Sequence, residues 1–244
     1  MKSILITGAS SGIGRATAEA FLTAGWRVGL VARRVDKLKE IADTHDAAVV
    51  LPADVTDMAA MQAVFETFVD TASHLDAVFN NAGMFGPSTT PDAIDLEAFD
   101  QVINVNVRGM FITAKLAFAQ MRTQSPQGGR IINNGSLSAH NPRPGSLCYT
   151  TSKHAVTGMT RTISLDGRVF NIACGQIDIG NARTELVEDL NARILAENPE
   201  ATLMPMMDVD DAARSVLHMA SLPLEANVQF MTVLATTMPY IGRG

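Results

Sequence analysis

Short apolar runs alternate with longer amphipathic stretches from one end of the chain to the other. These short runs have the length of β-strands and are rich in β-branched residues. Most are apolar at every position, which is typical of parallel strands covered on both faces of a sheet. The predicted strands are Ser3–Thr7, Arg27–Val31, Ala47–Leu51, Ala77–Asn80, Arg130–Asn134, Val169–Ala173 and Val228–Leu234.

Helical periodicity fills the intervals between the runs, in the stretches Ile13–Ala24, Met58–Ala72, Glu97–Met121, Tyr149–Leu165 and Val209–Ala220. Strand–helix–strand repetition implies a doubly wound parallel sheet of seven strands with helices on both faces, a three-layer, Rossmann-like α/β fold. The chain has 244 residues and contains neither a low-complexity linker nor an internal repeat. We therefore predict a single domain over residues 1–244.

Two segments interrupt the alternation. Met84–Asp95, which contains Gly and Pro, is predicted to be a loop. Ile177–Met207 follows the sixth predicted strand and is far longer than the roughly 2–6 residues that usually join a strand to a helix. It contains a helical pattern over Thr184–Glu197. Because doubly wound sheets bind ligands at the carboxyl ends of their strands, we predict that residues 177–207 form a substrate lid.

Composition excludes several classes of protein. The net charge is −6 and the longest basic run is Arg33-Arg34, so we expect no nucleic-acid partner. The longest uncharged stretch, Ala226–Gly242, is broken by polar residues and proline, and the first apolar run begins too early for a signal peptide, so we expect neither a membrane span nor export. Cys148 and Cys174 are too few for a disulfide scaffold and lack metal-ligand spacing, which favours a cytoplasmic protein without a metal.

A Gly-x3-Gly-x-Gly segment joins the first predicted strand to the first predicted helix. The N-terminus of a helix has unpaired N–H groups and a partial positive charge, and both attract phosphate. Glycines let the backbone approach a pyrophosphate closely. We predict a dinucleotide-binding turn, with an ordinary tight turn as the alternative. The candidate contacts are Gly8, Ser10, Gly12, Ile13 and Gly14.

The end of the second predicted strand bears on the choice of nucleotide. NAD-binding chains usually place Asp or Glu there, about 20 residues beyond the glycines, to bond the ribose 2′-hydroxyl. This chain has Ala32, Arg33 and Arg34 instead. A planar, permanently charged guanidinium suits a 2′-phosphate. We predict NADP(H) rather than NAD(H), with Arg33 as the main contact; the alternative is two solvated arginines that open a helix.

Candidate chemistry begins with Tyr149 and Lys153, which lie four residues apart at the start of a strongly helical stretch. This spacing places the phenol and the ammonium on one helix face. A neighbouring cation favours the phenolate and lowers the pKa of a tyrosine, which makes it a usable acid and base. Ser136 follows the fifth predicted strand and can face the reacting oxygen. Asn106, in the long predicted helix, could hold a water that relays protons from Lys153.

The residues Thr7–Gly14, Asn80–Gly83, Asn106, Ser136, Tyr149 and Lys153 resemble, in order and spacing, the short-chain dehydrogenase/reductase family. The resemblance covers about residues 1–180 strongly and is closest to the compact single-domain members. It implies that Tyr149 is the general acid/base, that Ser136 steadies the substrate oxygen, and that Lys153 tunes Tyr149 and binds the nicotinamide ribose. It implies that Asn106 completes the proton relay.

The same resemblance implies the remaining nucleotide contacts and a homodimer or homotetramer. Asp54 and Val55 would hold the adenine, Asn81, Ala82 and Gly83 would flank its ribose, and Ile177 would meet the nicotinamide amide. The chain departs from the family pattern in having Cys174-Gly175 where Pro-Gly is usual, and Ile179 where Thr is common. Thr184 could take the place of that threonine.

These patterns together predict an NADP(H)-dependent oxidoreductase that interconverts a ketone or aldehyde and an alcohol, with a small-molecule substrate. The alternative is a non-catalytic NADP(H)-binding sensor or scaffold of the same fold, because a fold alone does not establish chemistry. The complete set of Ser136, Tyr149, Lys153 and Asn106 favours catalysis, since a sensor has no need of an acid/base pair. His140 is interpreted as a loop residue near the substrate mouth.

Overall fold

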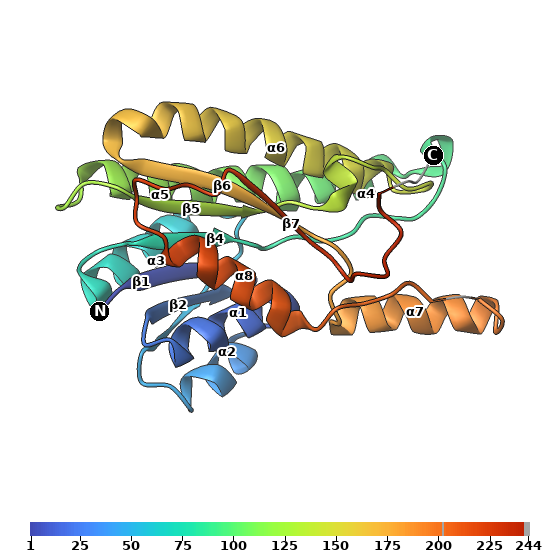
Figure 1. Cartoon of the computed structure of the whole chain (residues 1–244), viewed down its shortest axis with the longest axis horizontal. Helices are drawn as coiled ribbons and strands as arrows, with labels where there is room; N and C mark the ends of the chain where they lie inside the picture. Colours follow the sequence, from blue (N-terminus) through green and yellow to red (C-terminus); the bar gives the residue numbers. More distant parts are fainter. Residues whose placement is uncertain (202, 242–244) are drawn as a thin grey trace.

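All seven strands lie parallel in one sheet, in the order β3-β2-β1-β4-β5-β6-β7 (Figure 1). The structure is a computed structural model that describes residues 1–201 and 203–241. The strand order reverses between β1 and β4, the kind of switch point at which doubly wound sheets bind their ligands. The strands are β1 (Ser3–Thr7), β2 (Arg27–Ala32), β3 (Ala48–Pro52), β4 (Ala77–Asn80), β5 (Gly129–Asn134), β6 (Ile172–Ile179) and β7 (Phe230–Val233).

Helices cover both faces of the sheet, so the predicted three-layer, doubly wound architecture is confirmed (Figure 1). One face carries α1 (Gly12–Thr23), α2 (Val35–Ala42) and α8 (Val209–Ser221). The other face carries α3 (Met58–Ala72), α4 (Leu96–Ile103), α5 (Met110–Thr123) and α6 (Leu147–Gly167). The remaining helix, α7 (Glu185–Glu197), projects beyond the sheet in Figure 1.

Alternation along each strand divides the core between the two layers of helices. Ile4 and Ile6 pack toward α1 and α8, whereas Leu5, between them, packs toward α3 and α5. Phe79 and Val78 on β4 divide in the same way. Successive strand side chains point to opposite faces, so a strand that is apolar at every position requires helices on both sides.

The sixth strand is the main error of the sequence-based assignment. It was predicted at Val169–Ala173, but β6 spans Ile172–Ile179 and Val169 lies in a 3-10 turn. Ile177 is therefore inside a strand, and the predicted lid begins after Ile179 rather than at Ile177. The pattern misled because Gln176 and Asp178, polar and fully buried, alternate with Ile177 and Ile179 along the strand.

The long predicted helix Glu97–Met121 exists, with a change of winding in its middle. Between α4 and α5 the residues Asn104–Gly109 form a π-helical segment. The continuous helical stretch Leu96–Thr123 is the one described helix long and apolar enough to cross a membrane, a test that buried core helices also pass. Residues such as Ile112 and Met121 bury its inner face against the sheet.

The excursion after β6 contains the predicted helix. Thr184 caps α7 by accepting a hydrogen bond from the main-chain N–H of Val187 at 3.4 Å. The two ends of the excursion meet where Ala182 and Met207 form a parallel bridge. This bridge fixes the base of the excursion at the carboxyl edge of the sheet, where the predicted site lies.

Candidate active site

Tyr149 and Lys153 lie one turn apart near the start of α6, and the Lys153 ammonium is 5.4 Å from the centre of the Tyr149 ring. Lys153 is 3% exposed, and its Nζ donates to the main-chain oxygen of Asn134 at 2.8 Å. Phe85 packs edge-on against the Tyr149 ring, with 4.7 Å between the centroids. The helix and the end of β5 therefore hold the phenol and the ammonium side by side.

Ser136 is the second residue beyond the end of β5 and caps a short 3-10 turn, with its Oγ accepting from the main-chain N–H of Ser138 at 3.1 Å. It is buried, and its hydroxyl lies near enough to Tyr149 to lower the pKa of that phenol. The carboxyl ends of β5 and the first turn of α6 thus bring together Ser136, Tyr149 and Lys153, as the sequence pattern predicts.

Asn106 lies in the π-helical segment and is fully buried. Its Oδ1 accepts from Met84 N at 2.8 Å, and its Nδ2 donates to Met84 O at 2.8 Å and to Ser152 Oγ at 3.0 Å. The side chain thus ties the loop after β4 to α6.

Burial dominates the acid–base properties of this site. Desolvation raises the pKa of Tyr149, and the Ser136 hydroxyl and the Arg143 charge oppose that rise. Desolvation also lowers the pKa of Lys153 to about 8, against the opposing effect of Asp178. In both groups, burial disfavours the charged form. Without a bound nucleotide the site therefore favours a protonated tyrosine.

The glycine-rich turn has the geometry of a phosphate cradle. Gly8 and Gly12 both have positive φ, at +70° and +52°, which side chains strain to adopt. A Cβ on Gly14 would lie 2.2 Å from the Gly8 carbonyl oxygen. Only glycine therefore fits at position 14, in the first turn of α1. Ser10 and Ile13 belong to the same turn. Its shape and the helix N-terminus behind it fit a dinucleotide phosphate.

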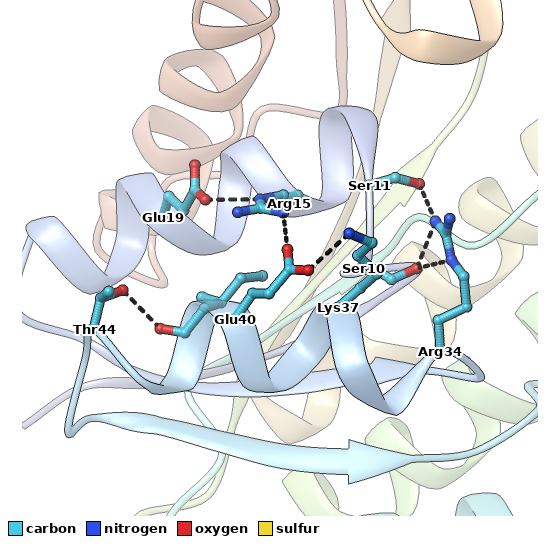
Figure 2. Close-up of polar contacts among 9 residues, drawn as sticks. Ser10, Ser11, Arg15, Glu19, Arg34, Lys37, Glu40 and Thr44 are labelled. Atoms are coloured by element: carbon cyan, nitrogen blue, oxygen red, sulfur yellow. Dashed lines mark hydrogen bonds and ion pairs between the residues drawn. The ribbon is translucent and has the colours of Figure 1, made fainter.

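Arg34, rather than Arg33, lies on this turn. Arg34 donates to Ser11 Oγ at 2.8 Å and to Ser10 Oγ at 3.1 Å, as Figure 2 shows. Arg33 is 80% exposed on its side chain, and its nearest carboxylate is Asp54 at 4.0 Å. The sequence pattern predicts Arg33, the first arginine of the pair, as the main contact of the nucleotide. Which guanidinium reaches back to the turn depends on how the chain leaves β2.

The other predicted nucleotide contacts line the same edge of the sheet. Asp54 accepts from the main-chain N–H and the hydroxyl of Thr56, and the main-chain bond is the first cause of its lowered pKa. Val55 packs on Gly109. Asn81 N and Ala82 N donate to Thr7 Oγ1 at 2.9 and 3.0 Å.

Two further predicted residues are placed by their neighbours. Gly83 lies next to the Asn106 side chain. Ile177 is buried in the core layer under α1 and α8, and its main-chain oxygen accepts from Gly135 N–H at 2.8 Å. Thr184, the suggested substitute for the missing threonine, lies against Gly12: a Cβ there would be 3.2 Å from Thr184 Cγ2.

Sequence reasoning missed Asp178. Its carboxylate is 1% exposed, accepts from the main-chain N–H of Ser136 at 2.8 Å and also binds His140. The available signal was the alternation of Gln176 and Asp178 with isoleucines, which indicates a strand with one polar face. Among the described residues, no group of three or more His, Cys, Asp or Glu side chains could hold a metal ion. Both cysteines are buried and unpaired.

The profile of the short chain dehydrogenase family matches residues 2–195. The chain is 32% identical over 225 residues to the 2-(R)-hydroxypropyl-CoM dehydrogenase of Xanthobacter autotrophicus, covering 85% of this chain and 88% of that protein. It is 30% identical to sulfoacetaldehyde reductase 2 of Chromohalobacter salexigens, over 96% of this chain and 94% of that protein.

Solved structures share the fold. A 3-ketoacyl-(acyl-carrier-protein) reductase from Brucella melitensis complexed with NADH superposes with a TM-score of 0.86 at 24% identity, over 96% of both chains. A serine dehydrogenase in a closed form with NADP+ superposes with a TM-score of 0.89 at 22% identity, over 99% of this chain and 98% of that one. The chain belongs to the short-chain dehydrogenase family. It is an oxidoreductase of that family, with the Rossmann-like α/β fold that these complexes with NADH and NADP+ share.

Proposed function

We propose that this protein is an NADP(H)-dependent oxidoreductase that interconverts a ketone or aldehyde and an alcohol, with Tyr149 as the general acid/base. The observation that carries the proposal is the convergence of the Ser136 hydroxyl, the Tyr149 phenol and the Lys153 ammonium at the carboxyl edge of β5. An acid/base group, a hydrogen-bond donor and a buried cation together suit proton transfer to a carbonyl oxygen.

The bound nucleotide would supply or accept the hydride, and the protein's own groups handle the proton. In reduction, Tyr149 gives its proton to the substrate oxygen, while Ser136 donates a hydrogen bond to the same oxygen and stabilises the developing negative charge. Lys153 stabilises the tyrosinate left behind, because its ammonium lies over the Tyr149 ring. In oxidation, Tyr149 must first lose its proton, so that direction should accelerate as the pH rises.

The nucleotide preference follows from the two arginines after β2. Arg34 is held on the glycine-rich turn by Ser10 and Ser11, and Arg33 extends into solvent beside Asp54. A guanidinium pairs well with a 2′-phosphate, whereas a free ribose hydroxyl would gain little from either arginine. We infer a preference for NADPH over NADH, with Arg34 added to the predicted contact Arg33.

Other parts of the assignment remain predictions. They are the remaining nucleotide contacts at Asp54, Val55, Asn81–Gly83 and Ile177, the substrate lid over α7, a single domain, a homodimer or homotetramer, and a cytoplasmic location. The two buried, unpaired cysteines suit a reducing compartment.

Replacing Tyr149 with Phe tests the proposed function. We expect turnover of every active compound in a panel of carbonyls and alcohols to fall by about 10³-fold or more, because the proton donor is lost. NADPH binding, followed by its fluorescence, should stay measurable. Thr150→Val, one residue along the same helix, is the matched control and should keep its activity. Near-normal turnover by Tyr149→Phe would overturn the mechanism, and nucleotide binding without any turnover by the unaltered protein would favour a sensor.

A further inference from the structure

A chain of buried polar side chains runs between the sheet and α6. Asn133 Nδ2 donates to Thr160 Oγ1 at 2.9 Å, and the Thr160 hydroxyl shares its one hydrogen between Val156 O at 2.9 Å and Gln176 Oε1 at 3.2 Å. Gln176 Nε2 then donates to Thr157 Oγ1 at 3.1 Å and to Asp178 Oδ1 at 2.7 Å. Buried polar groups are costly unless they are hydrogen bonded, so a satisfied chain of this kind calls for a reason.

The chain ends at the active site, on the Asp178 carboxylate. Asp178 Oδ1 accepts the main-chain N–H of Ser136 at 2.8 Å, in addition to the Gln176 amide. Asp178 Oδ2 lies 2.8 Å from Nε2 of His140. A carboxylate can only accept, so Nε2 of His140 is the donor and the tautomer of a neutral ring is fixed. One carboxylate thus binds both ends of the segment from Ser136 to His140.

Gly135 shows how closely the backbone and this carboxylate are fitted together. A Cβ at that position would lie 2.0 Å from Asp178 Oδ1 and 2.6 Å from Gln176 Nε2. No side chain can occupy this place while Asp178 keeps its position. The end of β5 is therefore shaped around the carboxylate, immediately before the residue that contacts Tyr149.

We propose that Asp178 is a positioning residue of the active site, which fixes the Ser136 main chain and the His140 ring relative to Tyr149 through one buried carboxylate. The proposal rests on the proposed function, since Ser136 and Tyr149 are the groups that it positions. Asp178 touches neither of the hydroxyl groups that would handle the proton. It acts through the residues it holds and through its charge.

The charge of Asp178 gives the proposal a readout that packing alone would not move. The titratable and charged groups around Tyr149 are Lys153 on the same helix, Arg143 in the preceding loop, Asp178 on β6, and His140 bound to Asp178. Asp178 raises the pKa of Tyr149, and Arg143 lowers it. Removing the carboxylate charge while keeping its shape should therefore make the phenol more acidic.

Asp178→Asn provides that change. Its amide oxygen can still accept from Ser136 and Gln176, and its NH2 can donate to His140 in the other tautomer. The chain has only two tyrosines, Tyr149 and Tyr240, so the phenolate absorbance of Tyr149 is obtained by subtracting the titration of the matched Tyr149→Phe protein. We expect the Tyr149 pKa to fall by about one unit, as for one charge several ångströms away at an effective dielectric constant of about 20.

Thr157→Val is the matched structural control. It removes another partner of the buried Gln176 amide and should lower the melting temperature, but it carries no charge and does not touch Ser136 or His140. The Tyr149 titration should stay where it is in the unaltered protein. An unchanged titration in Asp178→Asn, or an equal shift in Thr157→Val, would reduce Asp178 to an ordinary packing residue and overturn the proposal.

Turnover supplies the test of geometry. We expect Asp178→Ala to lower kcat by roughly 10²-fold with little change in KM, since small displacements of catalytic groups cost about that much. Asp178→Asn should recover most of that loss, because it keeps the acceptor for Ser136 N–H. Equal losses in both variants would contradict positioning. If the unaltered protein reduces no carbonyl compound, the proposed function fails, and the absorbance titration still decides the role of Asp178.

Discussion

Lys153 is an ammonium group held almost out of contact with water. Its Nζ donates to the Asn134 carbonyl, and the nearby carboxylate of Asp178 offsets only part of the cost of burial. The pKa consequently falls from 10.5 to about 8. In the proposed mechanism, this buried cation would stabilise the tyrosinate of Tyr149 once the proton has moved.

The lowered pKa of Lys153 predicts how stability depends on pH. Below about pH 8 the group is protonated in both states; between 8 and 10 the unfolded chain binds more protons, so its contribution to the free energy of unfolding rises with pH. In urea unfolding, the free energy of unfolding of the unaltered protein should rise relative to that of Lys153→Met over this interval, by at most about 1.4 kcal/mol per pH unit. Parallel pH profiles would contradict a lowered pKa. Above pH 10 the raised pKa of Tyr149 acts in the opposite direction.

At the scale of the element, the π-helical segment Asn104–Gly109 positions a functional side chain. Such segments shift the register of a helix and occur frequently at functional sites. Here the segment turns the Asn106 amide inward, where it binds both main-chain groups of Met84 and the Ser152 hydroxyl. The π-helical segment, the loop after β4 and α6 are thus joined through one amide.

Asn106→Ala should lower the free energy of unfolding by about 2–3 kcal/mol, because it leaves the Met84 main chain and Ser152 without their buried partner. Asn104→Ala is the control within the same segment. Asn104 is exposed and accepts only a long bond from Arg108 at 3.4 Å, so its loss should cost no more than about 0.5 kcal/mol. Urea unfolding measures both. Equal losses would show that Asn106 does not link these elements.

For the molecule as a whole, the topology gathers the site. β1, β4, β5 and β6 are neighbours in the sheet, and their carboxyl ends deliver the glycine-rich turn, Asn81, Ser136 and the base of the excursion that carries α7 to one edge. Residues that are far apart in sequence thereby meet at one edge of the sheet. A ligand bound there contacts much of the fold, so it should stabilise the entire chain.

NADPH should therefore raise the melting temperature more than NADH does at equal concentration. At about 100 times its dissociation constant, a ligand adds about 2.7 kcal/mol, which is about 5–10 °C for a chain of this size. Arg34→Gln should remove most of the difference between the two nucleotides. Arg15→Gln is the control, because Arg15 lies on the adjacent surface of α1, paired with Glu19 and Glu40 (Figure 2). Equal shifts with both nucleotides would refute the preference.

The sequence by itself determined the class of fold and the main groups of the site. Strands that are apolar at every position must be covered on both faces, and the spacing of Tyr149 and Lys153 places them on one helix face whatever surrounds them. These are local rules, so they can be applied without knowing the tertiary contacts.

Only the tertiary structure decided which arginine lies on the glycine-rich turn, where β6 ends and which side chain binds the Ser136 main chain. Arg33 and Arg34 are chemically equal, and the direction in which the chain leaves β2 selects Arg34. Aspartate is a residue type common in loops, yet Asp178 is buried. Gln176 on the same strand, and Ser136 and His140 in the connection between β5 and α6, supply its hydrogen bonds. Burial of a charge depends on partners distant in sequence, and no local pattern contains them.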